Sequence, residues 1–257
     1  MKKLKEIYSY RDVVRNFVAR DLKTRYKGSA LGFIWSFLNP LLNLVVLAIV
    51  FSFVIRAGVK NFPIFLLIGI LAWQFLASSL IQSSRSIIDN GGLIKKIYLA
   101  REIFPISIVI GNLIQLIFSL VVLIILLLFF QILPNLLWLF FPILLILQVL
   151  FVLGIALMLA ALSVFFRDVP ILVESSLPVW YFASPIFYPI SLIPEKYAGF
   201  YLLNPMASFL TAYRNIVLDN VFPGKEIMLV ILVSTFGSLL IGFYLFGKLE
   251  GKFAEEI

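Results

Sequence analysis

The chain contains neither cysteine nor histidine. It therefore has no disulfide, no thiol chemistry, no imidazole metal ligand and no histidine proton shuttle. It also lacks a G-x-x-x-x-G-K-[ST] loop, so it carries no recognisable means of hydrolysing ATP. Its carboxylates do not cluster as a metal-dependent membrane transferase would require. We therefore expect no metal or cofactor bound by this chain.

Apolar residues dominate what is present. They make up 62% of the 257 positions, which leaves too little polar surface for a soluble globule. Six apolar stretches could each cross the roughly 30 Å of membrane hydrocarbon, for which about 20 helical residues suffice. The sequence predicts an all-α polytopic protein, a single transmembrane domain over residues 1–257 whose spans lie at about 33–55, 63–84, 104–131, 136–165, 170–188 and 227–247.

The basic residues predict the orientation. Segments 1–32, 85–103, 166–169 and 248–257 carry 16 of the 21 Lys and Arg residues, and the remaining segments carry 5. Loops rich in Lys and Arg face the cytoplasm, so both termini, including the tail 248–257, are expected there. The net charge of +8 is then explained by anionic lipid headgroups at the membrane rather than by nucleic acid.

The first thirty residues are mostly polar and resemble no cleavable signal peptide. Between positions 4 and 26 apolar residues recur at steps of three and four, with basic residues on the other faces. This pattern predicts an amphipathic helix, within residues 1–30, that lies in the membrane interface. It could serve as a lever or collar for a partner or substrate, or only as an anchor in the headgroups.

Residues 85–102 form the longest internal cytoplasmic segment. A turn at Asp89-Asn90-Gly91-Gly92 precedes Leu93, Ile94, Ile97 and Tyr98, which alternate with two lysines. We predict a short amphipathic helix that either docks a separate ATPase or rests on lipid.

The fifth stretch differs from the others because it contains Glu174, Trp180 and Tyr181 and breaks up after residue 183. A carboxylate within a span is a functional candidate. However, Glu174 follows Pro170 by about one turn, where the helix dipole favours a carboxylate and water is close, so a structural role is equally open.

Segment 189–226 is too long for a turn and is divided by four prolines. Asn204 followed by Pro205 is a good helix start, and Phe209 and Tyr213 then lie on an apolar face that ends near residue 219. A helix of about thirteen residues reaches only some 20 Å and cannot cross. It could form a lid or gate at the outer mouth, or lie on the membrane surface.

Several motifs resemble the permease subunits of polysaccharide ABC exporters, those of O-antigen most closely. They cover most of the chain: RYKGSALGFIW at 25–35, LNPLL at 38–42, AREIFP at 100–105, FRDVP at 166–170, SPIFYP at 184–189, NPM at 204–206 and YR at 213–214. The spans also lack the charged ion sites of ion-coupled carriers, which is consistent with energy from a separate ATPase.

The resemblance implies a homodimer of six-helix subunits in the bacterial inner membrane. Two copies of a nucleotide-binding subunit, which uses ATP and Mg²⁺, would drive undecaprenyl-diphosphate-linked polysaccharide from cytoplasm to periplasm. It implies that ATPase coupling falls on residues 90–98, namely Asn90, Leu93, Ile94, Ile97 and Tyr98, and that spans 1 and 5 line the conduit. It assigns an outer gate to residues 189–219, including Pro189, Pro205, Phe209 and Tyr213.

Aromatic rings suit such a conduit, because the C–H faces of sugars can slide over them. The conduit candidates are Glu174 and the aromatic residues Trp35, Phe37, Trp180, Tyr181 and Tyr188, with Trp73 a weaker one. Aromatic residues also collect at membrane interfaces, which explains them without any substrate. At the cytoplasmic mouth the basic residues Arg20, Arg25 and Lys27 could meet the lipid diphosphate, although membrane anchoring explains them equally well.

Two other functions remain open. A permease of the same architecture could export capsule polymer, teichoic acid, a drug or a small lipid. A membrane glycolipid transferase would need to form product without ATP, and the sparse intramembrane acids argue against it.

Overall fold

The computed structural model describes residues 10–26, 32–50, 61–96 and 99–256, and its regular elements in these ranges are all helical. In chain order they are α2 (Arg11–Tyr26), η1 (Gly32–Ile34), α3 (Trp35–Ile49), α4 (Phe62–Asp89), α5 (Gly91–Ile94), α6 (Ile103–Phe129), η3 (Leu136–Phe140), α7 (Phe141–Phe165), α8 (Val169–Phe182), η4 (Ile190–Leu192), α9 (Glu195–Leu202), α10 (Pro205–Arg214), η5 (Asn215–Asp219), α11 (Lys225–Leu249), η6 (Glu250–Lys252) and α12 (Phe253–Glu256).

Four helical segments are long and apolar enough to cross a membrane: Phe62–Asp89, Ile103–Phe129, Leu136–Phe165 and Lys225–Lys252. With 27 to 30 residues each, they extend about 40–45 Å. They coincide with the second, third, fourth and sixth predicted spans and confirm these as long apolar helices.

The other two predicted spans are shorter. Helix α3 has 15 residues, and the predicted span continues into residues 51–55, outside the described ranges. Helix α8 has 14 residues and ends at Phe182, so the predicted boundary at 188 is wrong. Residues 183–189 are turns and bends, because Pro185 and Pro189 cannot donate the backbone hydrogen bonds that would continue a helix.

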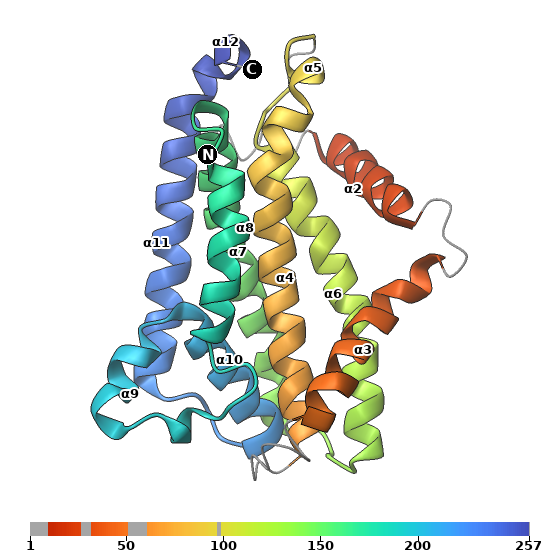
Figure 1. The fold of residues 1–257 in the computed structure, drawn as a ribbon, viewed down its shortest axis with the longest axis vertical. Coiled ribbons are helices and arrows are strands. Elements are labelled where there is room, and N and C mark those ends of the chain that lie inside the picture. Colours follow the sequence, from red (N-terminus) through yellow and green to blue (C-terminus); the bar gives the residue numbers. More distant parts are fainter. Residues whose placement is uncertain (1–9, 27–31, 51–60, 97–98, 257) are drawn as a thin grey trace.

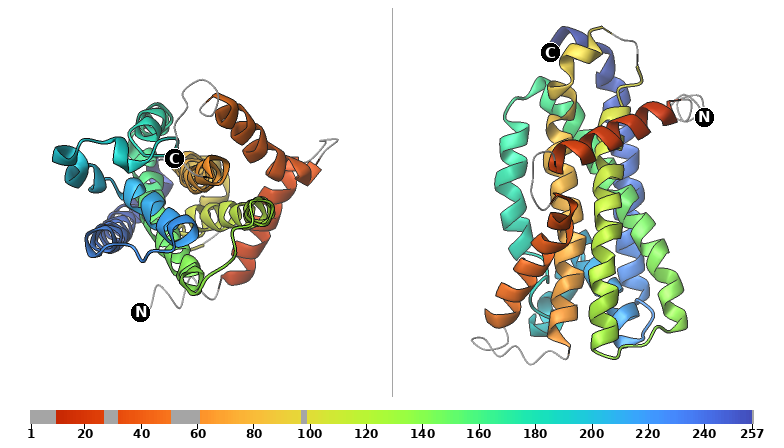
Figure 2. Two further views of the ribbon diagram at one scale, coloured as in Figure 1. Left: turned by 90° about the horizontal axis from the view of Figure 1, so that it is seen from below. Right: turned by 90° about the vertical axis from the view of Figure 1, so that its right-hand side faces the viewer.

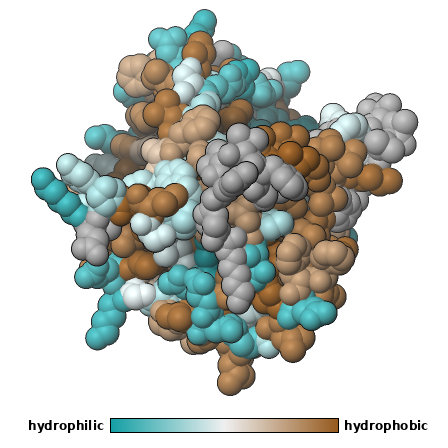
Figure 3. Space-filling model, turned by 60° about the horizontal axis from the view of Figure 1, so that its bottom comes forward, coloured by the Kyte–Doolittle hydropathy of each residue, from teal (hydrophilic) through white to brown (hydrophobic). Residues whose placement is uncertain are grey.

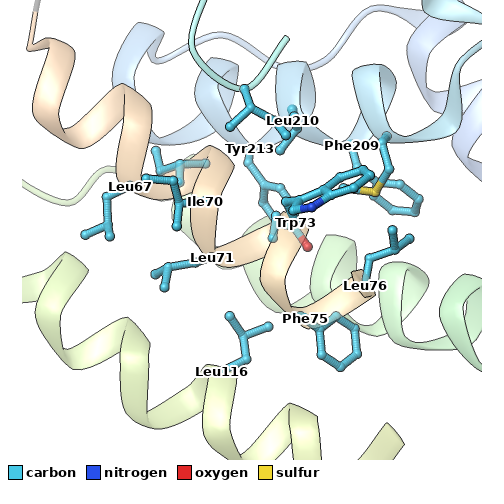
Figure 4. Packing of buried hydrophobic residues seen from close by; sticks show 14 of the residues in the cluster. Leu67, Ile70, Leu71, Trp73, Phe75, Leu76, Leu116, Phe209, Leu210 and Tyr213 are labelled. Atoms are coloured by element: carbon cyan, nitrogen blue, oxygen red, sulfur yellow. The ribbon is translucent and has the colours of Figure 1, made fainter. Parts of the chain in front are cut away.

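Helix α4 lies at the centre of the bundle and packs against α3, α6, α7, α8 and α10 (Figure 2). Its core side is continuous with residues of α10, whose Phe209, Leu210 and Tyr213 approach α4 from one side while Leu116 of α6 approaches from another (Figure 4). One buried amide in this core is paired at both ends. Gln148 of α7 donates from Nε2 to the Ala72 carbonyl at 2.9 Å and accepts from the Tyr213 hydroxyl at 2.8 Å.

Helices α7 and α11 touch backbone to backbone. A Cβ atom on Gly242 would overlap the Gly154 carbonyl, and one on Gly154 would overlap the backbone of residues 238 and 239. Small residues at a crossing allow the close approach that packs membrane helices without a hydrophobic driving force. The hydroxyl of Ser238 adds a hydrogen bond to the Phe151 carbonyl at 3.1 Å.

The two ends of the bundle differ. Helices α5 and α12 lie at one end, and α9 and α10 lie towards the other (Figure 1). Near the first end α2 crosses the bundle at a steep angle to α4 and α6 (Figure 2). Its apolar side faces inward, where the Phe17 ring meets the Phe104 ring of α6 at 5.3 Å. The predicted N-terminal helix is thus present from residue 11, while residues 4–9 lie outside the described ranges.

Candidate functional site

A cavity of about 710 Å³ opens at the end of the bundle that carries α5, and we call it the mouth cavity. Its walls come from α2, α4, α6 and α8. Basic, acidic and amide side chains line it, among them Arg20, Asp21, Gln82, Arg85, Asp89, Asn90 and Glu174. It therefore offers charged groups to a polar ligand at the predicted cytoplasmic side.

An ion pair joins two walls of the mouth cavity. Arg85 Nη2 of α4 lies 2.7 Å from Glu174 Oε1 of α8, and both side chains are about half exposed. Exposed pairs of this kind stabilise a fold by about 1 kcal/mol or less, so this pair matters more for where it holds charge. Glu174 is a candidate predicted from the sequence, whereas Arg85 was expected in the cytoplasmic segment 85–102.

Arg85 belongs to a helix because α4 runs through to Asp89, one turn beyond the predicted boundary at 84. In the predicted coupling segment 90–98, the described residues form a single helical turn from Gly91 to Ile94. The two adjacent glycines lose much backbone entropy in a helix, which limits it to that length.

Within this turn Ile94 is buried against Ile87, Phe104 and Phe253, while Leu93 is half-buried and Lys95 and Lys96 are exposed. Ile94 therefore anchors the segment, and the other side faces away from the bundle. The coupling candidates Ile97 and Tyr98 lie outside the described residues.

Arg20 reaches the mouth cavity from α2. Its guanidinium lies 4.6 Å from the centre of the Phe17 ring, and its Nη2 donates to Asn90 Oδ1 at 3.3 Å. Asn90 in turn donates from Nδ2 to the Ser86 carbonyl at 2.8 Å. The two other mouth candidates are not placed, because Lys27 and the side chain of Arg25 lie outside what the structure describes.

Aromatic residues gather at the C-terminal end of α8, beyond Glu174. The Trp73 ring meets the Trp180 and Tyr181 rings edge to face at 5.8 and 5.4 Å. Tyr188 joins the group through Phe187, whose ring centre lies 5.8 Å from that of Tyr181 and 5.2 Å from that of Tyr188. Three predicted conduit residues are thus brought together, and Trp73 belongs with them. Trp35 lies apart on α3 with 36% of its surface exposed, and the side chain of Phe37 is not described.

In segment 189–226 the structure confirms the predicted helix start at Asn204 and Pro205. Asn204 caps α10 through Oδ1, which accepts from Met206 N at 3.1 Å and also from Trp180 Nε1 at 2.9 Å, and Pro205 takes the first helical position. Pro189 precedes the short helix η4. Phe209 and Tyr213 are buried in the core, so whether they act in a gate stays a prediction.

Arg214, at the end of α10, is 5% exposed and joins three parts of the chain. Its guanidinium donates to the carbonyl of Phe65 in α4 and to the carbonyls of Pro185 and Ile186 after α8. It also lies 3.4 Å from the centre of the Phe65 ring. We call this arrangement the arginine clasp. It satisfies carbonyls that the proline break would otherwise leave unpaired.

The arginine clasp depends on a glycine. A Cβ atom at Gly69 would lie 2.9 Å from Arg214 Nη2 and 2.9 Å from the Ile186 carbonyl oxygen. Burial lowers the pKa of the Arg214 guanidinium, and Tyr201 and Asp219 oppose that shift. At the end of the bundle near α9 and α10, the surface mixes polar and apolar side chains (Figure 3).

Sequence reasoning missed a polar stripe along the central helix. Gln74, Ser78, Gln82, Arg85 and Asp89 follow one another on α4 at steps of three or four, which places them on one face. On α6 the residues Asn112, Gln115 and Ser119 have the same spacing, and Asn112 Nδ2 lies 3.4 Å from Gln82 Oε1. The helical spacing of polar residues within two apolar stretches was the available signal.

Known proteins support the resemblance seen in the motifs. The sequence pattern of the family described as "ABC-2 type transporter" matches residues 13–218. The O-antigen export system permease protein RfbA of Myxococcus xanthus is 33% identical over 256 residues, which cover 99% of this chain and 98% of that protein. RfbA of Klebsiella pneumoniae is 34% identical over 237 residues, or 92% and 91% of the two chains. The polysialic acid transport protein KpsM of Escherichia coli is 26% identical over 242 residues, or 90% and 91%.

Proposed function

The chain belongs to the ABC-2 type transporter family, and from this premise we propose that it is the permease subunit of an ATP-driven exporter of lipid-linked polysaccharide. The single observation that carries the proposal is the similarity to O-antigen export permeases over nearly the whole length of both chains. The substrate is an undecaprenyl-diphosphate-linked polymer of the O-antigen type, moved from cytoplasm to periplasm.

Energy comes from two copies of a separate ABC nucleotide-binding subunit that uses ATP and Mg²⁺. The full sequence has no phosphate-binding loop, so this chain supplies the path and the partner supplies hydrolysis. Contact with the partner falls on residues 90–98, where Lys95 and Lys96 point away from the bundle and Ile94 anchors the turn.

The subunit spans the inner membrane six times with both termini in the cytoplasm. The four long helices account for four crossings, and we assign the other two to the segments that contain α3 and α8. Helix α2 lies in the cytoplasmic interface, and α9 and α10 lie between spans 5 and 6 as the outer gate. The excess of basic residues in the segments at the α5 end supports this orientation.

Two copies enclose the conduit along α3 and α8. Both helices have exposed apolar sides, which in α8 include Leu172, Val179 and Phe182. Six helices hardly surround a sugar-wide pore, and a two-fold pair solves this geometric problem.

The two ends of α8 divide the work on the substrate. At the mouth cavity, Arg20 and Arg85 attract the lipid diphosphate, and Arg25 and Lys27, which follow Arg20 in the sequence, add to the positive charge of that segment. Farther along, the rings of Trp180, Tyr181 and Tyr188 offer weak and repeated contacts to the C–H faces of passing sugars. Strong contacts would hold the polymer, so weak ones favour movement.

Deleting the gene in its host and separating cytoplasmic from surface glycan tests the proposal. Long lipid-linked polymer should accumulate inside the cell and disappear from its surface. An unchanged surface glycan would overturn the polysaccharide assignment and favour a drug or small-lipid permease. The similarity to a polysialic acid transport protein favours a capsule-type polymer as second candidate, and the trapped glycan's composition would distinguish it.

A further inference from the structure

A second cavity, of about 190 Å³, lies farther along the groove between α4 and α6. Its polar lining consists of Gln74 and Ser78 of α4 and Asn112, Gln115 and Ser119 of α6, and Phe75 contributes an aromatic side chain. We call it the amide chamber. All of these residues belong to helices long enough to cross a membrane, where polar side chains usually mark a pathway.

The chemistry of the lining restricts the ligand. Every polar group is a neutral amide or hydroxyl, and these groups both donate and accept hydrogen bonds. The lining includes no carboxylate to hold a cation and no Lys or Arg to hold an anion. Such a site suits an uncharged ligand that is rich in hydroxyl groups.

The remaining wall is apolar. Phe75 is 3% exposed, and Leu71 and Leu116 lie beside it between α4 and α6 (Figure 4). A sugar ring presents hydroxyl groups at its edge and C–H groups on its faces. A cavity lined by both amides and a buried aromatic ring can contact both kinds of group.

The amide chamber adjoins the mouth cavity. Gln82 lines the mouth cavity, Asn112 lines the amide chamber, and the hydrogen bond between them is long at 3.4 Å. A bond of that length is weak, so a ligand's hydroxyl groups can replace it at little cost. At roughly 30 Å³ for each water, the chamber has room for about six waters, so a ligand would displace water rather than protein.

We infer that the amide chamber is a binding site for an uncharged sugar unit, reached from the mouth cavity past the Gln82–Asn112 pair. The inference rests on the proposed function and adds a sugar subsite to it, inside one subunit and distinct from the aromatic group on α8. The competing explanation is that the amides only hold α4 and α6 together.

The absence of cysteine from the sequence allows a direct test. Ser78→Cys and Ser119→Cys change one atom each and place a unique thiol in the amide chamber. The full permease, with its ATPase subunit and in native membranes, is exposed to methyl methanethiosulfonate or to a glucose-bearing methanethiosulfonate. Ile117→Cys, on the exposed side of α6, is the control.

Both chamber variants should react with both reagents at least tenfold faster than the Ile117→Cys control, because a thiol ionises only in contact with water. Reaction with the methyl reagent alone would mean that the chamber is too small for a sugar, and no reaction would mean that it is dry. Either result overturns the inference. The assay needs no transported polymer, so it stands even if gene deletion disproves polysaccharide export.

A second measurement separates binding from packing. Gln74→Met and Gln115→Met keep the side-chain volume but remove the amides. Export per permease molecule should fall at least fivefold in the double variant, while the thermal stability of the complex stays within 2 °C and Ile117→Met changes neither. A loss of stability with normal export per molecule would assign the amides to helix packing and overturn the sugar site.

Discussion

Two arginines at opposite ends of the bundle hold their charge in contrasting ways. Arg85 at the mouth cavity is about half exposed and pairs with the Glu174 carboxylate. Arg214 at the outer end is buried and donates to backbone carbonyls of Phe65, Pro185 and Ile186. Charge at the mouth stays within reach of a ligand, whereas the outer charge serves the architecture. Substitutions of Arg214 should therefore reduce stability, whereas substitutions of Arg85 should reduce export.

The largest effect is expected from Arg214→Met. It leaves the buried carbonyls of Pro185 and Ile186 without their donor at about 1–3 kcal/mol each and removes a second hydrogen bond from the Phe65 carbonyl, so the folded permease should largely disappear from membranes. Arg214→Lys should rescue little, because an ammonium cannot reach carbonyls in two segments with the geometry of a planar guanidinium. Membrane abundance and thermal unfolding in detergent measure this. Wild-type stability in Arg214→Met would refute the structural role of the arginine clasp.

Gly69→Ala should also weaken the arginine clasp, because Gly69 of α4 lies directly against it. The added methyl group meets Arg214 Nη2 and the Ile186 carbonyl, at an expected cost of about 1–3 kcal/mol. Gly92→Ala is the matched control, because a Cβ atom there meets nothing within 4 Å and alanine favours the helical turn. Thermal melts of the two variants should differ, and equal melting temperatures would contradict the close contact.

Arg85→Gln and Glu174→Gln should each change stability by less than about 1 kcal/mol, because the pair is exposed to solvent. Export should nevertheless fall in Arg85→Gln, which removes positive charge from the mouth cavity. The exchange Arg85→Glu with Glu174→Arg tests the pairing itself. Recovery of export in the exchanged protein would assign the role to the ion pair, and failure to recover would assign it to the position of the arginine.

Leu93→Asp should affect stability least, since this side chain is only half-buried. We expect export to fall because the ATPase partner no longer engages, and co-purification of the two subunits measures that directly. Ile94→Asp is the comparison, because its side chain is buried and its loss should reduce the amount of protein. Normal partner recovery and export in Leu93→Asp would remove the coupling role from this turn.

Local signals in the sequence were sufficient for part of this architecture. Of the six spans predicted from the long apolar stretches, four are long apolar helices, and Asn204 with Pro205 marked the start of α10, because capping depends only on neighbouring residues. Prediction failed where one element depends on another. Arg214 bonds to Phe65, 149 positions away, and nothing near either residue in the sequence indicates that pairing.

The candidate site residues show the same difference between local signals and contacts that join distant parts of the chain. Trp180, Tyr181 and Glu174 were found because they stand out within one apolar stretch. The mouth cavity needed Arg85 as well, which was assigned to the cytoplasmic segment 85–102 rather than to the second span. The amide chamber was missed because each of its amides looks unremarkable alone, and only the packing of α4 against α6 brings them together.

The backbone contact between Gly154 and Gly242 restricts how this permease can move. Side chains between two helices can change rotamer and let the helices slide, but α7 and α11 have no side chain at their closest approach. We therefore expect α7 and α11 to stay fixed relative to each other. We expect the rearrangements of a transport cycle at other helices, among them α3 and α8, which present exposed apolar side chains in the described part of the chain.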